Sequence, residues 1–79
     1  MTWTDYIVSD KNVLLGKPII KGTRISLEFI MQLFASGWTE QQIMENYPQI
    51  KKEHIKALFL FLLDDIKDKL ILNTVTEAA

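Results

Sequence analysis

A chain of 79 residues predicts one domain, 1–79, which buries only roughly 60–65% of the surface that its unfolded form exposes. The lack of cysteine excludes a disulfide framework and a thiolate metal site. A net charge of −1 excludes nucleic-acid binding driven by the charge of the whole chain. The longest apolar run, 57–63, is far short of the roughly 20 residues of a membrane span, and the polar N-terminus does not resemble a secretion signal. We therefore expect a cytoplasmic protein with no membrane segment.

The charges are unevenly distributed along the chain. Residues 1–24 hold four basic and two acidic side chains, a net +2, whereas residues 25–50 hold three glutamates and no base, a net −3. Residues 51–79 balance five lysines against five acids. Any contact with nucleic acid would therefore use local patches.

The first part of the chain predicts a small β-element. Residues 6–8 and 18–21 are rich in side chains that suit strands, and residues 9–12 have the composition of a turn. Residues 13–15 are apolar and fit no single element. Because an isolated two-stranded ribbon is marginal in water, a second subunit is a candidate to complete this element.

A first helix is predicted to begin after Ser26, its N-cap, and to end before Gly37. Its apolar residues follow the i, i+3, i+4, i+7 spacing of a helix face. These residues are Leu27, Ile30, Met31 and Phe34, and Phe29 and Leu33 widen the stripe. We expect this helix to be mostly buried.

A second helix has the clearest start signal in the chain. Thr39 and Gln42 have the spacing of a capping box, and Trp38 and Ile43 have that of a hydrophobic staple. The helix is expected to end by Asn46, because the proline two residues later disfavours helical geometry in the residue before it.

A third helix is predicted to begin near Lys51 or Lys52 and to reach about Leu72, which leaves 73–79 as a flexible tail and about 5–72 as the core of the domain. Its predicted core stripe is Ile55, Leu58, Phe59, Leu62 and Ile66. A second apolar set falls on the opposite side of the helix: Ala57, Leu60 and Phe61. So small a domain offers little cover for this set, so we favour an interface with a second subunit or a partner over cover by the chain's own strands or tail.

The run 16–26 combines two glycines, a proline, two lysines and the only arginine, and it leads directly into the first helix. One interpretation is a recognition loop that presents Lys17, Lys21 and Arg24 to phosphates or acidic side chains. The other is structural, with Arg24 pairing with Glu28 one turn into the helix. The run lacks the glycine and hydroxyl spacing of a phosphate-binding loop.

Three specific elements are found together in this order: Gly-Lys-Pro-x-Ile-x-Gly-Thr-Arg at 16–24, Gly-Trp-Thr at 37–39 and Tyr-Pro at 47–48. Over about residues 5–65 the sequence resembles the domain of unknown function 433 family. The resemblance implies a mainly α fold in prokaryotes, a three-helix, homeodomain-like helix-turn-helix core with a short N-terminal β-element. It also implies a link to PIN-like ribonucleases, because many members are encoded beside one and are similar to antitoxins of toxin–antitoxin pairs. The family's conserved loop carries over onto Gly16, Lys17, Pro18, Gly22, Thr23 and Arg24.

One departure from the family pattern concerns the start of the third helix. Lys51 stands where members more often have Thr or Ser. The change removes a capping hydroxyl worth about 1 kcal/mol. It also places a positive charge at the positive end of the helix dipole.

Two sets of binding residues follow from the basic and apolar patterns. Residues expected to contact DNA are Arg24, Lys51, Lys52, His54 and Lys56. Residues expected at a dimer or partner interface are Lys17, Lys21, Arg24, Ala57, Leu60 and Phe61.

No catalytic set stands out in the sequence. His54 is the only histidine, and an exposed or capping role is commoner for such a residue than catalysis. Asp64 and Asp68 share a helix face among lysines, which indicates a solvated surface rather than a metal site. We therefore expect no enzyme, no cofactor and no metal.

The leading hypothesis is an antitoxin-like homodimer that neutralises a PIN-like ribonuclease and binds its own operator DNA. The alternatives are a standalone DNA-binding transcriptional regulator and a protein–protein adaptor without DNA binding. The acidic middle third of the chain favours the adaptor over strong DNA binding.

Overall fold

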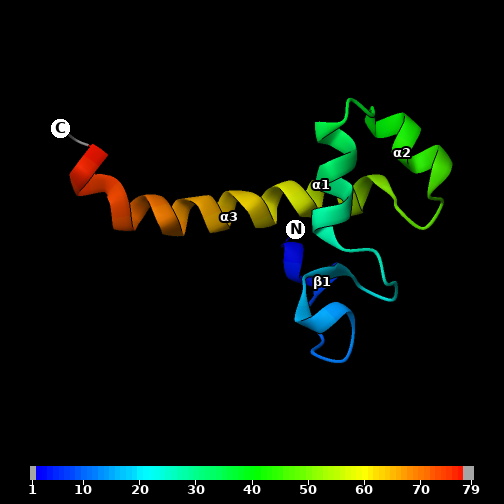
Figure 1. Ribbon diagram of the computed structural model, residues 1–79, viewed down its shortest axis with the longest axis horizontal. Coiled ribbons are helices and arrows are strands. Elements are labelled where there is room, and N and C mark those ends of the chain that lie inside the picture. The colour runs from blue at the N-terminus through cyan, green and yellow to red at the C-terminus, as the bar shows by residue number, and fades with distance from the viewer. Residues whose placement is uncertain (1, 78–79) are drawn as a thin grey trace.

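The computed structural model describes the backbone of residues 2–77 and the side chains of residues 2–69. Three helices follow a small N-terminal β-element (Figure 1). In chain order the elements are η1 (Trp3–Asp5), β1 (Ile7–Val8), η2 (Leu14–Gly16), β2 (Ile19–Ile20), α1 (Leu27–Ala35), α2 (Glu40–Asn46) and α3 (Lys52–Glu77), where η denotes a short 3-10 helix. The predicted mainly α class with a helix-turn-helix core is confirmed.

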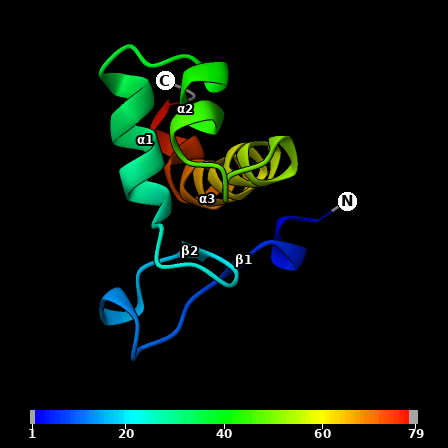
Figure 2. The ribbon, with the colours of Figure 1, turned by 90° about the vertical axis from the view of Figure 1, so that its right-hand side faces the viewer.

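The β-element forms within the chain. The strands β1 and β2 pair antiparallel, with Ile7 opposite Ile20 and Val8 opposite Ile19. A further bridge joins Ile19 to Ser26, directly before α1. Figure 2, which looks along α3, shows α1 and α2 on one side of that helix and the two strands on the other. The strands therefore cover part of the surface of α3 that α1 and α2 leave open.

The junction between α1 and α2 is specified by local hydrogen bonds. The Ser26 hydroxyl accepts from the backbone N–H of Phe29 at 3.0 Å, which caps α1 as predicted. At the other end, the N–H of Gly37 donates to the carbonyl of Phe34 and the N–H of Trp38 donates to the carbonyl of Leu33, both at 3.0 Å. This is a Schellman motif, and it needs the left-handed φ of +97° that Gly37 adopts.

The start of α2 is the predicted capping box. The N–H of Gln42 donates to Thr39 Oγ1 at 3.1 Å, and the N–H of Thr39 donates to Gln42 Oε1 at 2.8 Å. Trp38 packs against the core that contains Ile43, as the predicted staple requires. The helix ends at Asn46, again as predicted.

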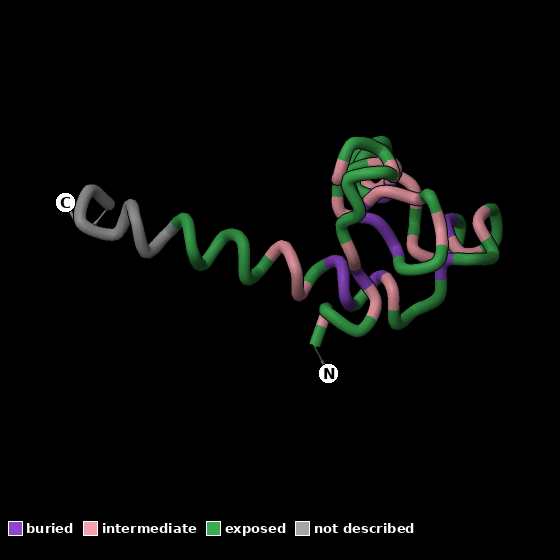
Figure 3. The backbone as a smooth tube through the Cα atoms, turned by 90° about the horizontal axis from the view of Figure 1, so that it is seen from below, coloured by how far each residue is buried: buried purple, intermediate pink, exposed green. Residues whose placement is uncertain are grey.

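The core lies where the strands, α1, α2 and the start of α3 meet, and it consists mostly of isoleucine. Figure 3 shows the buried residues gathered in this body, whereas residues 63–69 of α3 are exposed. The cluster of buried residues is Ile7, Ile20, Leu27, Ile30, Ile43, Ile50, Ile55, Ala57 and Leu58. Met31, predicted within the buried stripe of α1, is 41% exposed, because the neighbouring elements cover only the side of α1 that carries Leu27 and Ile30.

The helix α3 differs from the prediction in which of its faces is covered. Phe59 and Ile66, predicted in the core stripe, are 50% and 51% exposed. Ala57, predicted on an outward face, is fully buried, and Phe61 packs against the core. A helical wheel shows two apolar faces but cannot say which one the rest of the chain covers.

The helix α3 is also longer than predicted. It continues to Glu77, five residues beyond the expected end at about Leu72. Residues 73–77 have modest helix propensity but contain no glycine or proline, so nothing in them terminates a helix that has already formed. Residues 78–79 of the predicted tail lie outside the described residues.

Candidate functional site

The Gly16–Arg24 loop is fixed to the body mainly by its own backbone. The N–H of Leu27 donates to the carbonyl of Pro18 at 3.0 Å, and the N–H of Ile20 donates to the carbonyl of Ile25 at 2.9 Å. Thr23 closes the turn, because its hydroxyl donates to the carbonyl of Ile20 at 2.8 Å and accepts from the N–H of Ile25 at 3.0 Å. The loop is thus a rigid connector that leads the chain into α1.

The ion pair at this loop differs from the one considered in the sequence. Lys17 Nζ lies 3.0 Å from Glu28 Oε1, whereas the structural interpretation of the run paired that glutamate with Arg24. Both partners are more than half exposed, so the pair contributes little to stability. Arg24 and Lys21 are exposed on the loop, so they are accessible for the predicted contacts with DNA or a partner.

The three residues before Lys17 have an unusual backbone. Leu14, Leu15 and Gly16 have φ values of +49°, +58° and +82°, all in the left-handed region. Only glycine adopts this region without a steric penalty. The side chain of Leu15 is 94% exposed, so no burial offsets its strain.

His54 caps the helix whose start departs from the family pattern. The N–H of Lys51 donates to His54 Nδ1 at 2.8 Å, so an imidazole nitrogen accepts where a capping box has a Glu or Gln. The ring also packs edge-on against Tyr6, with centroids 5.6 Å apart. Desolvation lowers the pKa of His54 below 6.5; the charge of Glu53 opposes this shift and that of Lys51 adds to it. The structure assigns His54 to this cap, so its Nδ1 is not presented to DNA.

The lysines at the start of α3 lie beside carboxylates. Lys51, Lys52 and Lys56 are exposed, as the predicted DNA contacts require. However, Lys52 and Lys56 share an open hollow of about 470 Å³ with Glu40 of α2 and Glu53. These two carboxylates reduce the positive potential that a phosphate would meet there.

The predicted interface on α3 is largely covered by the chain itself. Trp3 packs edge-on against Phe61 with ring centroids 4.9 Å apart, and its indole N–H donates to Asp64 Oδ2 at 2.8 Å. Ala57 is buried and Leu60 is partly covered beside Trp3, so this set does not form one free apolar face. Sequence reasoning missed Trp3; the signal was a large aromatic residue just before the first strand.

A family described as "Protein of unknown function (DUF433)" matches residues 7–61, which is more than half of the chain. The chain belongs to this family. Neither the curated proteins nor the solved structures contain a significant match. The matched region of this DUF433 protein spans the β-element, α1, α2 and the part of α3 that contributes to the core.

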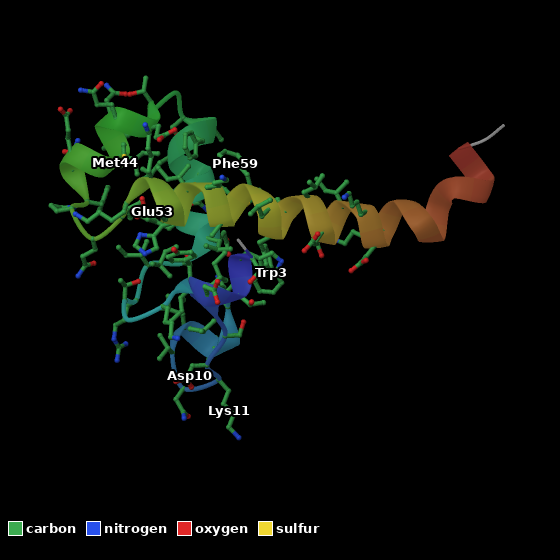
Figure 4. The ribbon with its side chains drawn as sticks, turned by 180° about the vertical axis from the view of Figure 1, so that it is seen from behind. Trp3, Asp10, Lys11, Met44, Glu53 and Phe59 are labelled. Carbon is green, nitrogen blue, oxygen red and sulfur yellow. The ribbon has the colours of Figure 1, made fainter. Side chains whose placement is uncertain are left out.

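A different face of α3 is exposed and apolar. Phe59, Leu63 and Ile66 are 50%, 46% and 51% exposed and lie at i, i+4 and i+7 on one side of the helix. Phe59 starts this stripe beside α1, where its ring centroid is 5.6 Å from that of Phe34. Figure 4 shows Phe59 and Trp3 on opposite sides of α3. We call Phe59, Leu63 and Ile66 the α3 stripe.

The part of the chain that the structure describes contains no helix of the length and apolar character that crossing a membrane requires. Within the same part, no three His, Asp or Glu side chains come together as they would around a metal ion.

Proposed function

We propose that this DUF433 protein is a non-catalytic, antitoxin-like module that binds and neutralises a PIN-like ribonuclease. One observation carries the proposal: α3 leaves the body of the domain and presents the α3 stripe along the projecting segment (Figure 1). Exposed apolar side chains that continue a core helix mark a surface suited to a protein partner. An amphipathic helix of this kind binds by laying its apolar face in a groove.

The family supports the choice of partner by resemblance alone, since many members are encoded beside a PIN-like protein. The direct test is co-expression of this chain with such a neighbouring protein. A stable complex and relief of the ribonuclease's toxicity support the proposal. A ribonuclease that neither co-purifies with the chain nor loses toxicity contradicts it. A Leu63→Lys variant tests the role of α3 in the same assay, with Lys11→Glu as a control at an exposed loop position.

Autoregulation through DNA is a second candidate function, favoured by the exposed basic side chains of the helix-turn-helix and the preceding loop. Lys51, Lys52 and Lys56 would contact phosphates at the start of α3, and Arg24 would contribute from the loop. A dimer would place two such units on an operator. Binding to operator DNA that weakens steeply as salt rises supports this function, and weak binding that salt leaves unchanged contradicts it.

A further inference from the structure

Charges on α3 are segregated about the α3 stripe. At 100° per residue, Phe59, Leu63 and Ile66 fall within about 60° of one another. The lysines between residues 52 and 69 all lie within about 80° of Phe59, on both sides of it. They are Lys52, Lys56, Lys67 and Lys69. The acids of the same segment all lie at least about 120° from Phe59. They are Glu53, Asp64, Asp65 and Asp68.

Contacts within the chain account for two of these acids on the far side of the helix. Asp64 accepts the hydrogen bond of the Trp3 indole, and Asp65 pairs with Lys69 at 3.2 Å. At the body end, Glu40 and Glu53 line the hollow beside Lys56, so the charge there is mixed. Farther along α3, Lys67 borders Leu63 and Ile66, and its neighbour Asp64, three residues earlier, lies on the side away from the stripe. The outer part of the stripe is therefore apolar with a basic border.

From this arrangement we infer the chemistry of the partner: the α3 stripe binds an apolar protein groove whose rim carries carboxylates. The inference rests on the proposed partner-binding function and specifies the surface that this function requires. Leu63 and Ile66 enter the groove, and Lys67 beside them meets rim carboxylates. Complementary charge at the rim selects the partner and speeds association, while the buried apolar side chains supply most of the affinity.

A second copy of this chain does not offer such a groove. If two α3 stripes faced each other in an antiparallel pair, the row of Lys56 and Lys67 would meet the same row of the other copy. In a parallel pair it would meet the side that carries Lys69. Neither arrangement offers Lys67 a carboxylate that lacks a partner, because Asp65 on the side of Lys69 already pairs with that lysine. In the antiparallel pair, the facing lysine rows also disfavour association. Dimerisation through another surface is compatible with this conclusion.

An anionic membrane surface is also a poorer fit than a protein groove. Residues 52–69 hold four lysines and four acids, so this segment gains little from the overall field of anionic lipids. The exposed stripe is also narrow, whereas a helix that lies in a membrane interface buries a broad apolar face. A groove matches a narrow stripe with local charge at its edge.

The first test uses two synthetic probes with the full chain. Both are amphipathic helical peptides of about 15 residues with the same leucine stripe, one bordered by Glu and the other by Lys. In an NMR titration the Glu-bordered peptide is expected to shift resonances of 59–67 and to bind at least about 10-fold more tightly than the Lys-bordered peptide. Equal binding of the two peptides, or shifts confined to other surfaces, overturns the inference.

Variants of the chain locate the contact. Leu63→Lys is expected to weaken binding of the Glu-bordered peptide by at least about 30-fold. Lys67→Glu is expected to weaken it by about 10-fold and to flatten its salt dependence. Lys11→Glu changes the charge equally at a loop tip that Figure 4 shows pointing away from α3, and is expected to have no effect. Circular dichroism checks that each variant folds. If Leu63→Lys does not fold, the result for Lys67→Glu alone tests the inference. Equal effects of Lys67→Glu and Lys11→Glu overturn the inference.

The same variants separate this inference from the proposed function. A complex with the neighbouring PIN-like ribonuclease that Lys67→Glu and Leu63→Lys leave intact overturns the inference and preserves the function. Preference for the Glu-bordered peptide without any ribonuclease complex preserves the inference and overturns the function. If the chain sediments with phosphatidylcholine–phosphatidylglycerol vesicles and Leu63→Lys abolishes this, the stripe binds lipid. If Leu63→Lys halves the molar mass in solution, the stripe binds a second copy of the chain. Either of these last two results overturns the inference.

Discussion

Replacing Leu15 by glycine is expected to stabilise the protein, although it removes a large apolar side chain. Leu15 has φ +58° and ψ +31°, which places it in the left-handed helical region. Its side chain is 94% exposed, so its loss uncovers almost no apolar surface. Whether the variant is more or less stable therefore depends only on the backbone strain in the folded chain and the backbone entropy of the unfolded chain.

The magnitude follows from two opposing contributions. A non-glycine residue in the left-handed region costs roughly 1–2 kcal/mol. Glycine removes this cost but gives back about 0.4–1 kcal/mol, because it increases the freedom of the unfolded chain. The Leu15→Gly variant should therefore gain about 0.5–1 kcal/mol in the free energy of unfolding. For a domain of this size this corresponds to a rise in Tm of about 2–8 °C.

Urea and thermal unfolding followed by circular dichroism measure this gain. Leu15→Ala is the matched control, because it also removes the exposed side chain but keeps the left-handed penalty. Its stability should equal that of the wild type within about 0.5 kcal/mol. If Leu15→Gly is no more stable than Leu15→Ala, the account of strain at Leu15 is refuted.

Three further predictions concern the caps and the N-terminal contact with α3. The pKa of His54 is lower in the folded chain than the value of 6.5 in the unfolded chain, so the stability that this difference provides is fully present above pH 6.5. Stability should fall as the pH drops below 6.5, because the unfolded chain then takes up a proton at His54 before the folded chain does. His54→Gln, which keeps a cap acceptor, should abolish this part of the pH dependence in urea titrations, and an unchanged profile would contradict the role of His54. Thr39→Ala should lower the free energy of unfolding by about 1 kcal/mol, whereas Thr39→Ser should leave it nearly unchanged; equal losses would argue against the capping box. Trp3→Ala should cost about 2 kcal/mol through the lost contacts with Phe61 and Asp64, and wild-type stability of that variant in urea would show that this contact does not hold η1 on α3.

The sequence predicted those parts of the fold that depend on neighbouring residues. The Ser26 cap, the Gly37 terminus and the Thr39–Gln42 capping box each involve side chains and backbone within a few positions, so their spacing is sufficient to identify them. The two strands were also located within a residue or two, because a proline and a glycine bound the second one.

The sequence did not predict which face of α3 is covered. That choice depends on Trp3, which lies 61 positions from its hydrogen-bond partner Asp64. Periodicity describes each face of a helix but not the segment that packs on it. The same limit applied to Glu28, whose partner is Lys17 from the preceding loop rather than Arg24 one turn before it.

The exposed apolar surface was predicted on the correct helix but with the wrong residues. The apolar surplus on α3 pointed to an interface, yet Ala57 and Phe61 are covered within the chain. The surface left over is formed by Phe59, Leu63 and Ile66. His54 was predicted among the DNA contacts, and a capping or exposed role was preferred to catalysis. The hydrogen bond that it accepts from the N–H of Lys51 shows that it caps α3.

The family match and the buried core end at almost the same place on α3. The match stops at residue 61, and the last residue of the buried cluster is Leu58. Beyond this point Leu62 still packs on the core and Asp64 still binds Trp3, but Leu63, Ile66 and Lys67 are exposed. Substitutions at these three positions should therefore have only small effects on folding. The exposed side chains of α3 from Leu63 to Lys69 can therefore change in evolution, or be exchanged by engineering, while the body that carries them stays the same.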